Sequence, residues 1–167
     1  MKGFEEIDAI ELQYCGPNGR PTLGKAFDML VDRWNAGHHD REIALRLLFL
    51  GWLSWMGDPN TGLATRPPAD FFKELFDSLG GEDAEDQELW FVVGVMTNVW
   101  AGAFGGLESE NHWEEIGERF RHSLGNRVNH MDVGMFEGRG YYGHYFAHQA
   151  RGHTEHWLKE SPPSSRH

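Results

Sequence analysis

The feature that most constrains the fold is a run of nineteen uncharged, mostly apolar residues, 89–107, which reads LWFVVGVMTNVWAGAFGGL. A run of this length could span a membrane or form the central helix of a soluble bundle. Thr97, Asn98 and several glycines interrupt it, and no Lys or Arg flanks it closely. We therefore expect no membrane partner and a core helix that its neighbours approach closely at Gly94 and Gly102.

Elsewhere, apolar residues recur at three- and four-residue spacing, and glycines separate the periodic segments. This pattern predicts an all-α fold, a single irregular bundle of about six helices. We expect the helices at about residues 22–36, 41–56, 69–79, 82–107, 109–124 and 141–158. Thr22 and Asp40 are candidate caps for the first two helices. The second helix is apolar on all sides from Leu47 onward, so we expect it to be central and buried.

The two ends of the chain are less regular. Residues 4–15 alternate loosely between apolar and polar side chains, which allows a short N-terminal strand. We expect one helical domain over residues 1–160 and a mobile tail over residues 161–167. The first residues carry carboxylates where a secretory signal needs an apolar core, so we expect no export by that route and a cytoplasmic protein.

The charge balance excludes some function classes. Lys and Arg number 15 and Asp and Glu number 26, which gives a formal net charge of −11. Such an acidic chain repels phosphate groups, so we expect no nucleic-acid partner. The lone Cys15 can form neither an internal disulfide nor a thiolate metal cluster.

Two glycine-containing strings match nucleotide-binding motifs only in part. Residues 19–25 resemble a phosphate-binding loop, but Ala26 follows them where the loop needs Ser or Thr. Pro21 also lacks the backbone N–H that such a loop would donate to phosphate. Residues 138–143 have the spacing of a dinucleotide fingerprint, but too little chain follows for the second strand. We interpret both strings as turns, and because no Gly-x-Ser-x-Gly elbow occurs either, the sequence favours a protein that is not an enzyme.

Residues 137–156 combine glycines, aromatic residues and four histidines within and around one predicted helix. His144 and His148 are four residues apart, which places both imidazoles on one helical face, as in zinc-binding helices. A third ligand would have to come from His112, His122, His130 or Glu137. We predict no cofactor, with zinc or another divalent metal at His144 and His148 as the alternative.

The same histidine-rich segment could instead hold a small ligand. We predict this site at Glu137, Arg139, Tyr142 and His144. Arg139 would hold an anion, and a histidine would act as a base or a ligand. This gives the alternative function, a small-ligand or metal-dependent protein.

The first hypothesis for function rests on an acidic run ahead of the long apolar segment. Glu82, Asp83, Glu85 and Asp86 stabilise a helix start, and they could also dock a basic protein, because complementary charge speeds encounter and suppresses wrong partners. One or two exposed Trp beside these acids would add a hot spot. We therefore favour a non-enzymatic protein-binding module, immunity- or adaptor-like, with a homo-oligomer as a further alternative.

Overall fold

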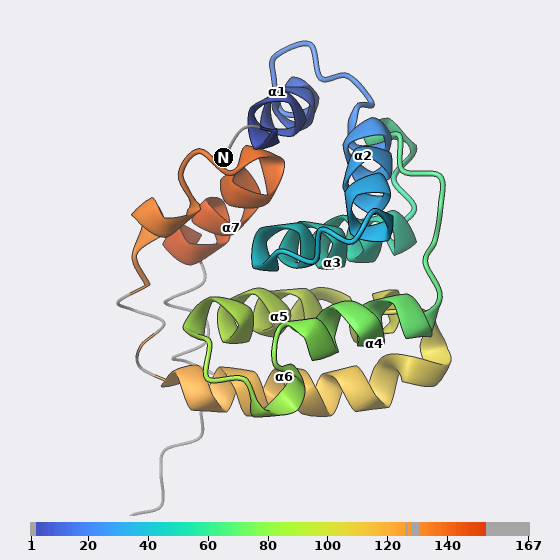
Figure 1. The fold of residues 1–167 in the computed structure, drawn as a ribbon. Helices are drawn as coiled ribbons and strands as arrows, with labels where there is room; N and C mark the ends of the chain where they lie inside the picture. The colour runs from blue at the N-terminus through green and yellow to red at the C-terminus, as the bar shows by residue number, and fades with distance from the viewer. Residues whose placement is uncertain (1–2, 126, 128–130, 153–167) are drawn as a thin grey trace, which may run out of the picture.

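The structure is a computed structural model that describes residues 3–125, 127 and 131–152. These residues contain seven α-helices and no strand, which confirms the all-α bundle (Figure 1). The helices are α1 (Phe4–Tyr14), α2 (Leu23–Asn35), α3 (Arg41–Trp55), α4 (Ala69–Ser78), α5 (Gln87–Trp100), α6 (Glu110–Leu124) and α7 (Gly140–Gly152). The end predicted for the last helix and the tail predicted at 161–167 lie outside the described residues.

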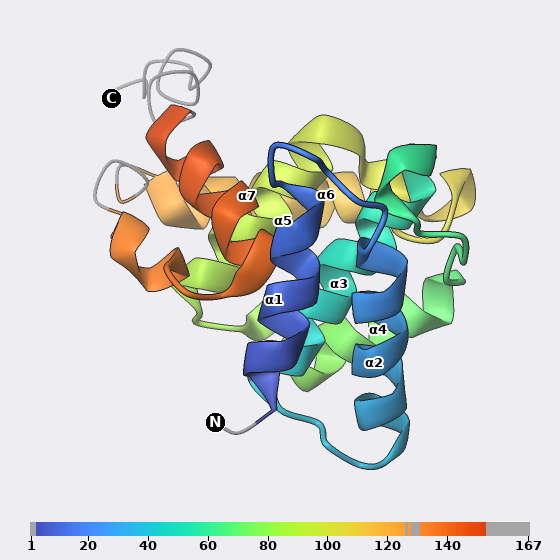
Figure 2. The same ribbon diagram turned by 90° about the horizontal axis from the view of Figure 1, so that it is seen from above.

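Helix α3 is the centre of the bundle. It contacts α2, α4, α5 and α7, and it lies between the α5–α6 pair and the group formed by α1, α2 and α7 (Figure 1). Seen from above, α1 lies between α7 and α2 (Figure 2). The burial predicted from Leu47 onward is confirmed over residues 47–52 and also extends back to Ile43, because this helix has neighbours on every face. Toward the end of the predicted segment, Leu53 and Trp55 are only partly buried and Met56 is exposed.

The nineteen-residue apolar run forms α5 and a following 3₁₀ turn, η3 (Ala101–Ala103), rather than one long helix. Asp86 caps α5, since its carboxylate accepts a hydrogen bond from the backbone N–H of Leu89 at 3.1 Å. The helix ends at Trp100, whose carbonyl oxygen accepts a hydrogen bond from the indole of Trp52 at 3.0 Å. Within the described part of the chain, no helix is long and apolar enough to cross a membrane.

Helix α6 approaches α5 most directly at Gly117, a position that the sequence did not single out. A Cβ on Gly117 would lie 1.9 Å from the hydroxyl oxygen of Thr97 in α5. At the two positions predicted for close approach, the carbonyl of Gly94 accepts a hydrogen bond from Arg121 of α6 at 2.8 Å. Gly102 lies against the indole of Trp100, from its own segment rather than from another helix.

The predicted N-terminal strand is wrong, because residues 4–14 form helix α1. Phe4, Ile7, Ile10 and Glu11 are buried, and their spacing of three and four residues is helical. The alternating interpretation gave weight to Leu12, which is apolar but exposed.

The predicted helix caps also differ from the structure. Thr22 precedes α2, but its hydroxyl donates a hydrogen bond to the carbonyl of Ile10 in α1 at 2.6 Å instead of capping α2. Asp40 precedes α3 without a side-chain cap hydrogen bond. The Thr22 contact fixes the end of the loop that joins α1 to α2.

Candidate functional site

Helix α7 begins with two glycines that allow close packing. Gly140 has a φ of +59°, and a Cβ there would lie 2.1 Å from Oε2 of Glu11 in α1. At Gly143 a Cβ would lie 2.0 Å from the carbonyl oxygen of Phe136, in the 3₁₀ turn η6 (Val133–Phe136). The glycines of this segment therefore let α7 lie directly against α1 and η6.

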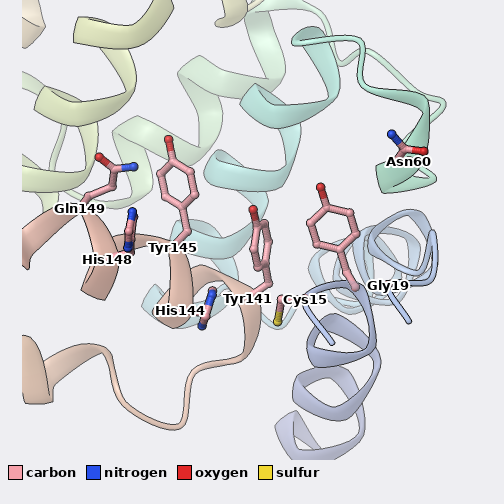
Figure 3. A pocket seen from close by; sticks show the side chains of 9 residues that line it. Cys15, Gly19, Asn60, Tyr141, His144, Tyr145, His148 and Gln149 are labelled. Atoms are coloured by element: carbon pink, nitrogen blue, oxygen red, sulfur yellow. The ribbon is translucent and has the colours of Figure 1, made fainter. Parts of the chain in front are cut away.

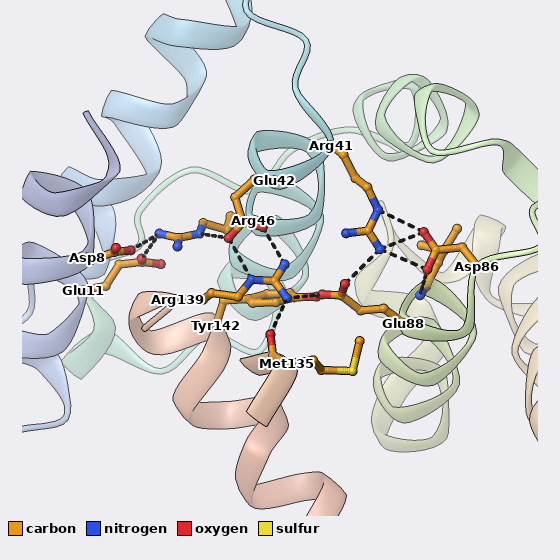
Figure 4. Close-up of polar contacts among 11 residues, drawn as sticks. Asp8, Glu11, Arg41, Glu42, Arg46, Asp86, Glu88, Met135, Arg139 and Tyr142 are labelled. Atoms are coloured by element: carbon orange, nitrogen blue, oxygen red, sulfur yellow. Dashed lines mark hydrogen bonds and ion pairs between the residues drawn. The ribbon is translucent and has the colours of Figure 1, made fainter. Parts of the chain in front are cut away.

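On the side of α7 that faces α3 and α5, charged side chains form a network of buried and partly buried ion pairs (Figure 4). Arg46 of α3 contacts Asp8 at 2.5 Å and Glu11 at 2.8 Å, both from α1, and Glu42 at 2.9 Å. The Arg46 side chain is 2% exposed and that of Glu11 is 0% exposed. These contacts join α1 to the central helix through charge rather than apolar packing alone.

Arg139, one residue before α7, extends the network to α5. Its guanidinium contacts Glu42 at 2.5 Å and Glu88 at 2.6 Å (Figure 4). The hydroxyl of Tyr142 donates to Glu88 at 2.6 Å, and the Arg139 guanidinium lies 4.8 Å from the Tyr142 ring centroid. Arg41 contacts Glu88 from the other side at 2.9 Å. The start of α7 is therefore held against both α3 and α5.

The network holds more acid than base, since five carboxylates face three guanidinium groups. Burial raises the pKa of Glu11 to about 8, in spite of the opposing charge of Arg46. Its Oε1 has no hydrogen-bond partner among the described residues. Burial would also raise the pKa of Glu42, but the hydrogen bond and charge of Arg139, together with Arg46, lower it overall. Glu11 is therefore mainly protonated at neutral pH.

The other side of α7 lines a pocket of about 590 Å³ between α7, the end of α1 and the 3₁₀ turn η1 (Pro59–Thr61) (Figure 3). In the figure, the hydroxyl groups of Tyr141 and Tyr145 point toward the same side. The lining residues are Tyr14, Cys15, Gly19, Asn60, Tyr141, His144, Tyr145, His148 and Gln149.

Three of the four tyrosines of the chain line this pocket. The Tyr14 and Tyr141 ring centroids are 4.9 Å apart at 74°, and those of Tyr141 and Tyr145 are 6.2 Å apart at 66°. Within the described part of the chain, none of the three hydroxyls has a hydrogen-bond partner, whereas the fourth tyrosine, Tyr142, is bonded to Glu88. The three pocket hydroxyls are therefore available to a ligand.

The acidic groups of the pocket keep their protons at neutral pH. Burial raises the pKa of Tyr14, Tyr141, Tyr145 and Cys15. The negative charge of Asp58 raises the pKa of Tyr14 and Tyr141 further. The pocket thus presents neutral phenols and a neutral thiol, which can donate hydrogen bonds.

The four residues of the predicted ligand site do not converge on one cavity. Arg139 and Tyr142 belong to the ion-pair network, where the guanidinium is bonded to two carboxylates. His144 lines the pocket on the other side of α7, and Glu137 is exposed at the end of η6. Of these four, only His144 contributes to the pocket.

His144 and His148 line the same pocket and are both exposed, on the shared face that their spacing indicates. Among the described residues, no three His, Cys, Asp or Glu side chains are grouped closely enough to hold a metal ion. Of the third ligands considered, His112 and His122 lie on α6, and His130 lies outside the described residues. Zinc binding by this pair remains a hypothesis.

The acidic run lies at and just before the start of α5, and two of its four carboxylates form ion pairs. Asp86 caps the helix and contacts Arg41 at 2.8 Å, and Glu82 contacts Arg119 at 3.5 Å. Asp83 and Glu85 are exposed and form no ion pair with any described residue.

The sequence patterns predict neither the ion-pair network nor the α1 side of the pocket. The available signal was Arg46, because a charged residue within a helix that is apolar on all sides needs a buried partner. Glu11 gave a second signal through its helical spacing with Ile7. No local pattern could place Tyr14 and Cys15 beside α7, because that contact depends on how distant helices pack.

Comparison with known proteins gives no family to which this chain could be assigned. No protein-family model, no curated protein and no solved structure matches it. Function must therefore be inferred from the pocket and from the contacts that hold its walls.

Proposed function

We propose that this protein binds a small organic molecule in the pocket between α1, η1 and α7. The observation that carries the proposal is the set of three tyrosine hydroxyls that line the pocket without a protein partner among the described residues. Pockets of roughly 300–1,000 Å³ with aromatic walls and a few polar groups are typical of small-molecule sites. At about 590 Å³ this pocket lies within that range.

The walls of the pocket favour reversible binding over covalent chemistry. The thiol of Cys15 donates a hydrogen bond to the carbonyl of Leu12 at 3.5 Å, and burial raises its pKa, so it is a poor nucleophile at neutral pH. The imidazoles of His144 and His148 add hydrogen-bond donors and acceptors.

The ion-pair network supports this function from the other side of α7. It fixes the start of the helix to α3 and α5 through Arg139, and it fixes α1 to α3 through Arg46. Both helical walls are therefore held in place before a ligand arrives, which lowers the entropic cost of binding.

A thermal-shift panel on untagged, chelator-treated protein tests the proposal. The panel contains neutral heteroaromatic molecules, organic cations, sugars, simple anions and Zn²⁺. A ligand at a hundred times its Kd adds about 2.7 kcal/mol to the free energy of unfolding. For a domain of this size, that corresponds to a rise in Tm of roughly 5–10 °C.

A blocking variant locates the binding site. His148 is exposed on the pocket wall, so His148→Trp places a larger ring at the opening, whereas His122→Trp makes the same change on the exposed surface of α6. We expect the ligand-induced shift to vanish in the first variant and to persist in the second. A shift that survives His148→Trp, or a panel without any shift, would contradict the proposal.

Docking of a basic protein at the start of α5 is the second candidate, supported by the exposed Asp83 and Glu85, which have no ion pair in the described structure. We expect the double charge reversal Asp83→Lys and Glu85→Lys to weaken a salt-sensitive complex, because rim charges govern encounter. These two positions are better tests than Asp86, whose side chain caps α5. Unchanged retention of a partner by the double variant would remove this candidate.

A further inference from the structure

We infer that the ligand of the tyrosine pocket is a small organic cation whose charge is spread over alkyl or ring carbon, such as an alkylated ammonium group. This inference rests on the proposed function and adds the chemical class of the ligand. It follows from three properties of the pocket, namely its aromatic walls, the absence of Lys and Arg among the described residues that line it, and a carboxylate beside it.

The aromatic walls supply the first argument. Tyr14, Tyr141 and Tyr145 follow one another at 74° and 66°, so the rings form walls with different orientations and not a flat parallel stack. Each is only partly buried. The face of a phenol ring attracts a cation within about 6 Å, and aromatic cages are a known solution for binding quaternary ammonium groups.

The charges around the pocket supply the second argument. No Lys or Arg occurs among the described residues that line the pocket, so an anionic ligand would find no permanently charged partner among them. The carboxylate of Asp58, at the start of η1, lies beside the pocket, since it accepts a hydrogen bond at 2.9 Å from the N–H of Asn60, a lining residue. The same negative charge raises the pKa of Tyr14 and Tyr141. The formal net charge of −11 adds attraction for cations at long range.

The probe pair is choline and its uncharged carbon analogue, 3,3-dimethylbutan-1-ol, which have nearly the same shape. Each is titrated into the protein while NMR follows the backbone amides of Tyr141 and Tyr145. We expect choline to shift these amides and to bind at least about tenfold more tightly than the alcohol, because only choline gains the cation–π attraction. Equal or tighter binding of the alcohol would overturn the inference.

A charge-removing variant tests the role of Asp58. Its carboxylate accepts a hydrogen bond from the N–H of Asn60 at 2.9 Å, and Asn can accept the same bond, so Asp58→Asn removes the charge and keeps the turn. Asp132→Asn is the matched control, since Asp132 caps η6 in the same way at 2.9 Å from Gly134. We expect Asp58→Asn to weaken choline about threefold at low salt and the control to have no effect. Unchanged choline binding in Asp58→Asn would refute the electrostatic argument.

Different results would overturn the proposed function and the inferred ligand class. If neutral molecules of the panel shift the amides of Tyr141 and Tyr145 and choline does not, the inference of a cation is overturned and the pocket remains a binding site. If no molecule of any class shifts these amides, the proposed function is overturned together with the inference.

Discussion

Substitution of Glu11 by Gln tests the account of the buried network. Glu11 is 0% exposed, and burial raises its pKa from 4.5 to about 8 in the folded protein. When the pKa of a carboxyl group is higher in the folded state than in the unfolded state, the protonated carboxyl group stabilises the fold. The contribution of Glu11 is therefore fully present below about pH 4.5 and is lost as the pH rises through about 8.

The size of the effect follows from the shift in pKa. Each unit is worth about 1.36 kcal/mol, so the raised pKa of Glu11 lowers the free energy of unfolding by roughly 3 kcal/mol at pH 7 relative to strongly acidic pH. Gln cannot ionise, but its buried amide leaves one donor unpaired, at a cost of about 1–2 kcal/mol. We therefore expect Glu11→Gln to stabilise the protein by about 1–2 kcal/mol at pH 7.

The pH dependence is the sharper readout. Urea unfolding of the wild type and Glu11→Gln is measured at pH 5, 6.5 and 8, with Glu6→Gln, an exposed change on the same helix, as the control. The stability difference between Glu11→Gln and wild type should grow by roughly 3–4 kcal/mol from pH 5 to pH 8. Parallel pH profiles for wild type and Glu11→Gln would refute the claim that Glu11 retains its proton in the fold.

Four further substitutions test the packing of the bundle, each by urea or thermal unfolding. Arg139→Ala removes one of the two guanidinium groups that contact each of Glu42 and Glu88, so it should lower the free energy of unfolding by about 2–3 kcal/mol, and a loss below 1 kcal/mol would contradict the network. Tyr142→Phe should cost about 1–2 kcal/mol, whereas Tyr145→Phe should cost less than about 0.5, because only Tyr142 has a protein partner for its hydroxyl among the described residues. Gly117→Ala should cost about 2 kcal/mol, since its Cβ would lie 1.9 Å from the Thr97 hydroxyl, and a neutral result would contradict the close approach of α6 to α5.

Helical periodicity and glycine stops predicted most of the fold. The starts predicted at residues 41 and 69 coincide with the first residues of α3 and α4, and the burial of α3 on all sides followed from its apolar pattern. The pattern failed at residues 4–15, because the few apolar residues there fit both the two-residue period of a strand and the 3.6-residue period of a helix. It also joined α5 to η3, because composition does not reveal where the backbone turns after Trp100.

The candidate site was predictable only in part. The glycine-, tyrosine- and histidine-containing segment does supply one wall of the pocket, through Tyr141, His144 and His148. The prediction placed Arg139 in a ligand site because no local pattern showed that Glu42 and Glu88, from distant segments, would contact it. Roles of this kind depend on tertiary packing, which a single sequence does not encode locally.

The most direct test of the central claim is fluorine NMR of protein labelled with 3-fluorotyrosine. The chain has four tyrosines, of which Tyr14, Tyr141 and Tyr145 line the pocket, and Tyr142 is buried against Glu88 as an internal reference. We predict that a ligand from the panel shifts the three pocket signals and leaves that of Tyr142 in place. Ligands that bind without moving those three signals, or that move only the Tyr142 signal, would contradict this prediction.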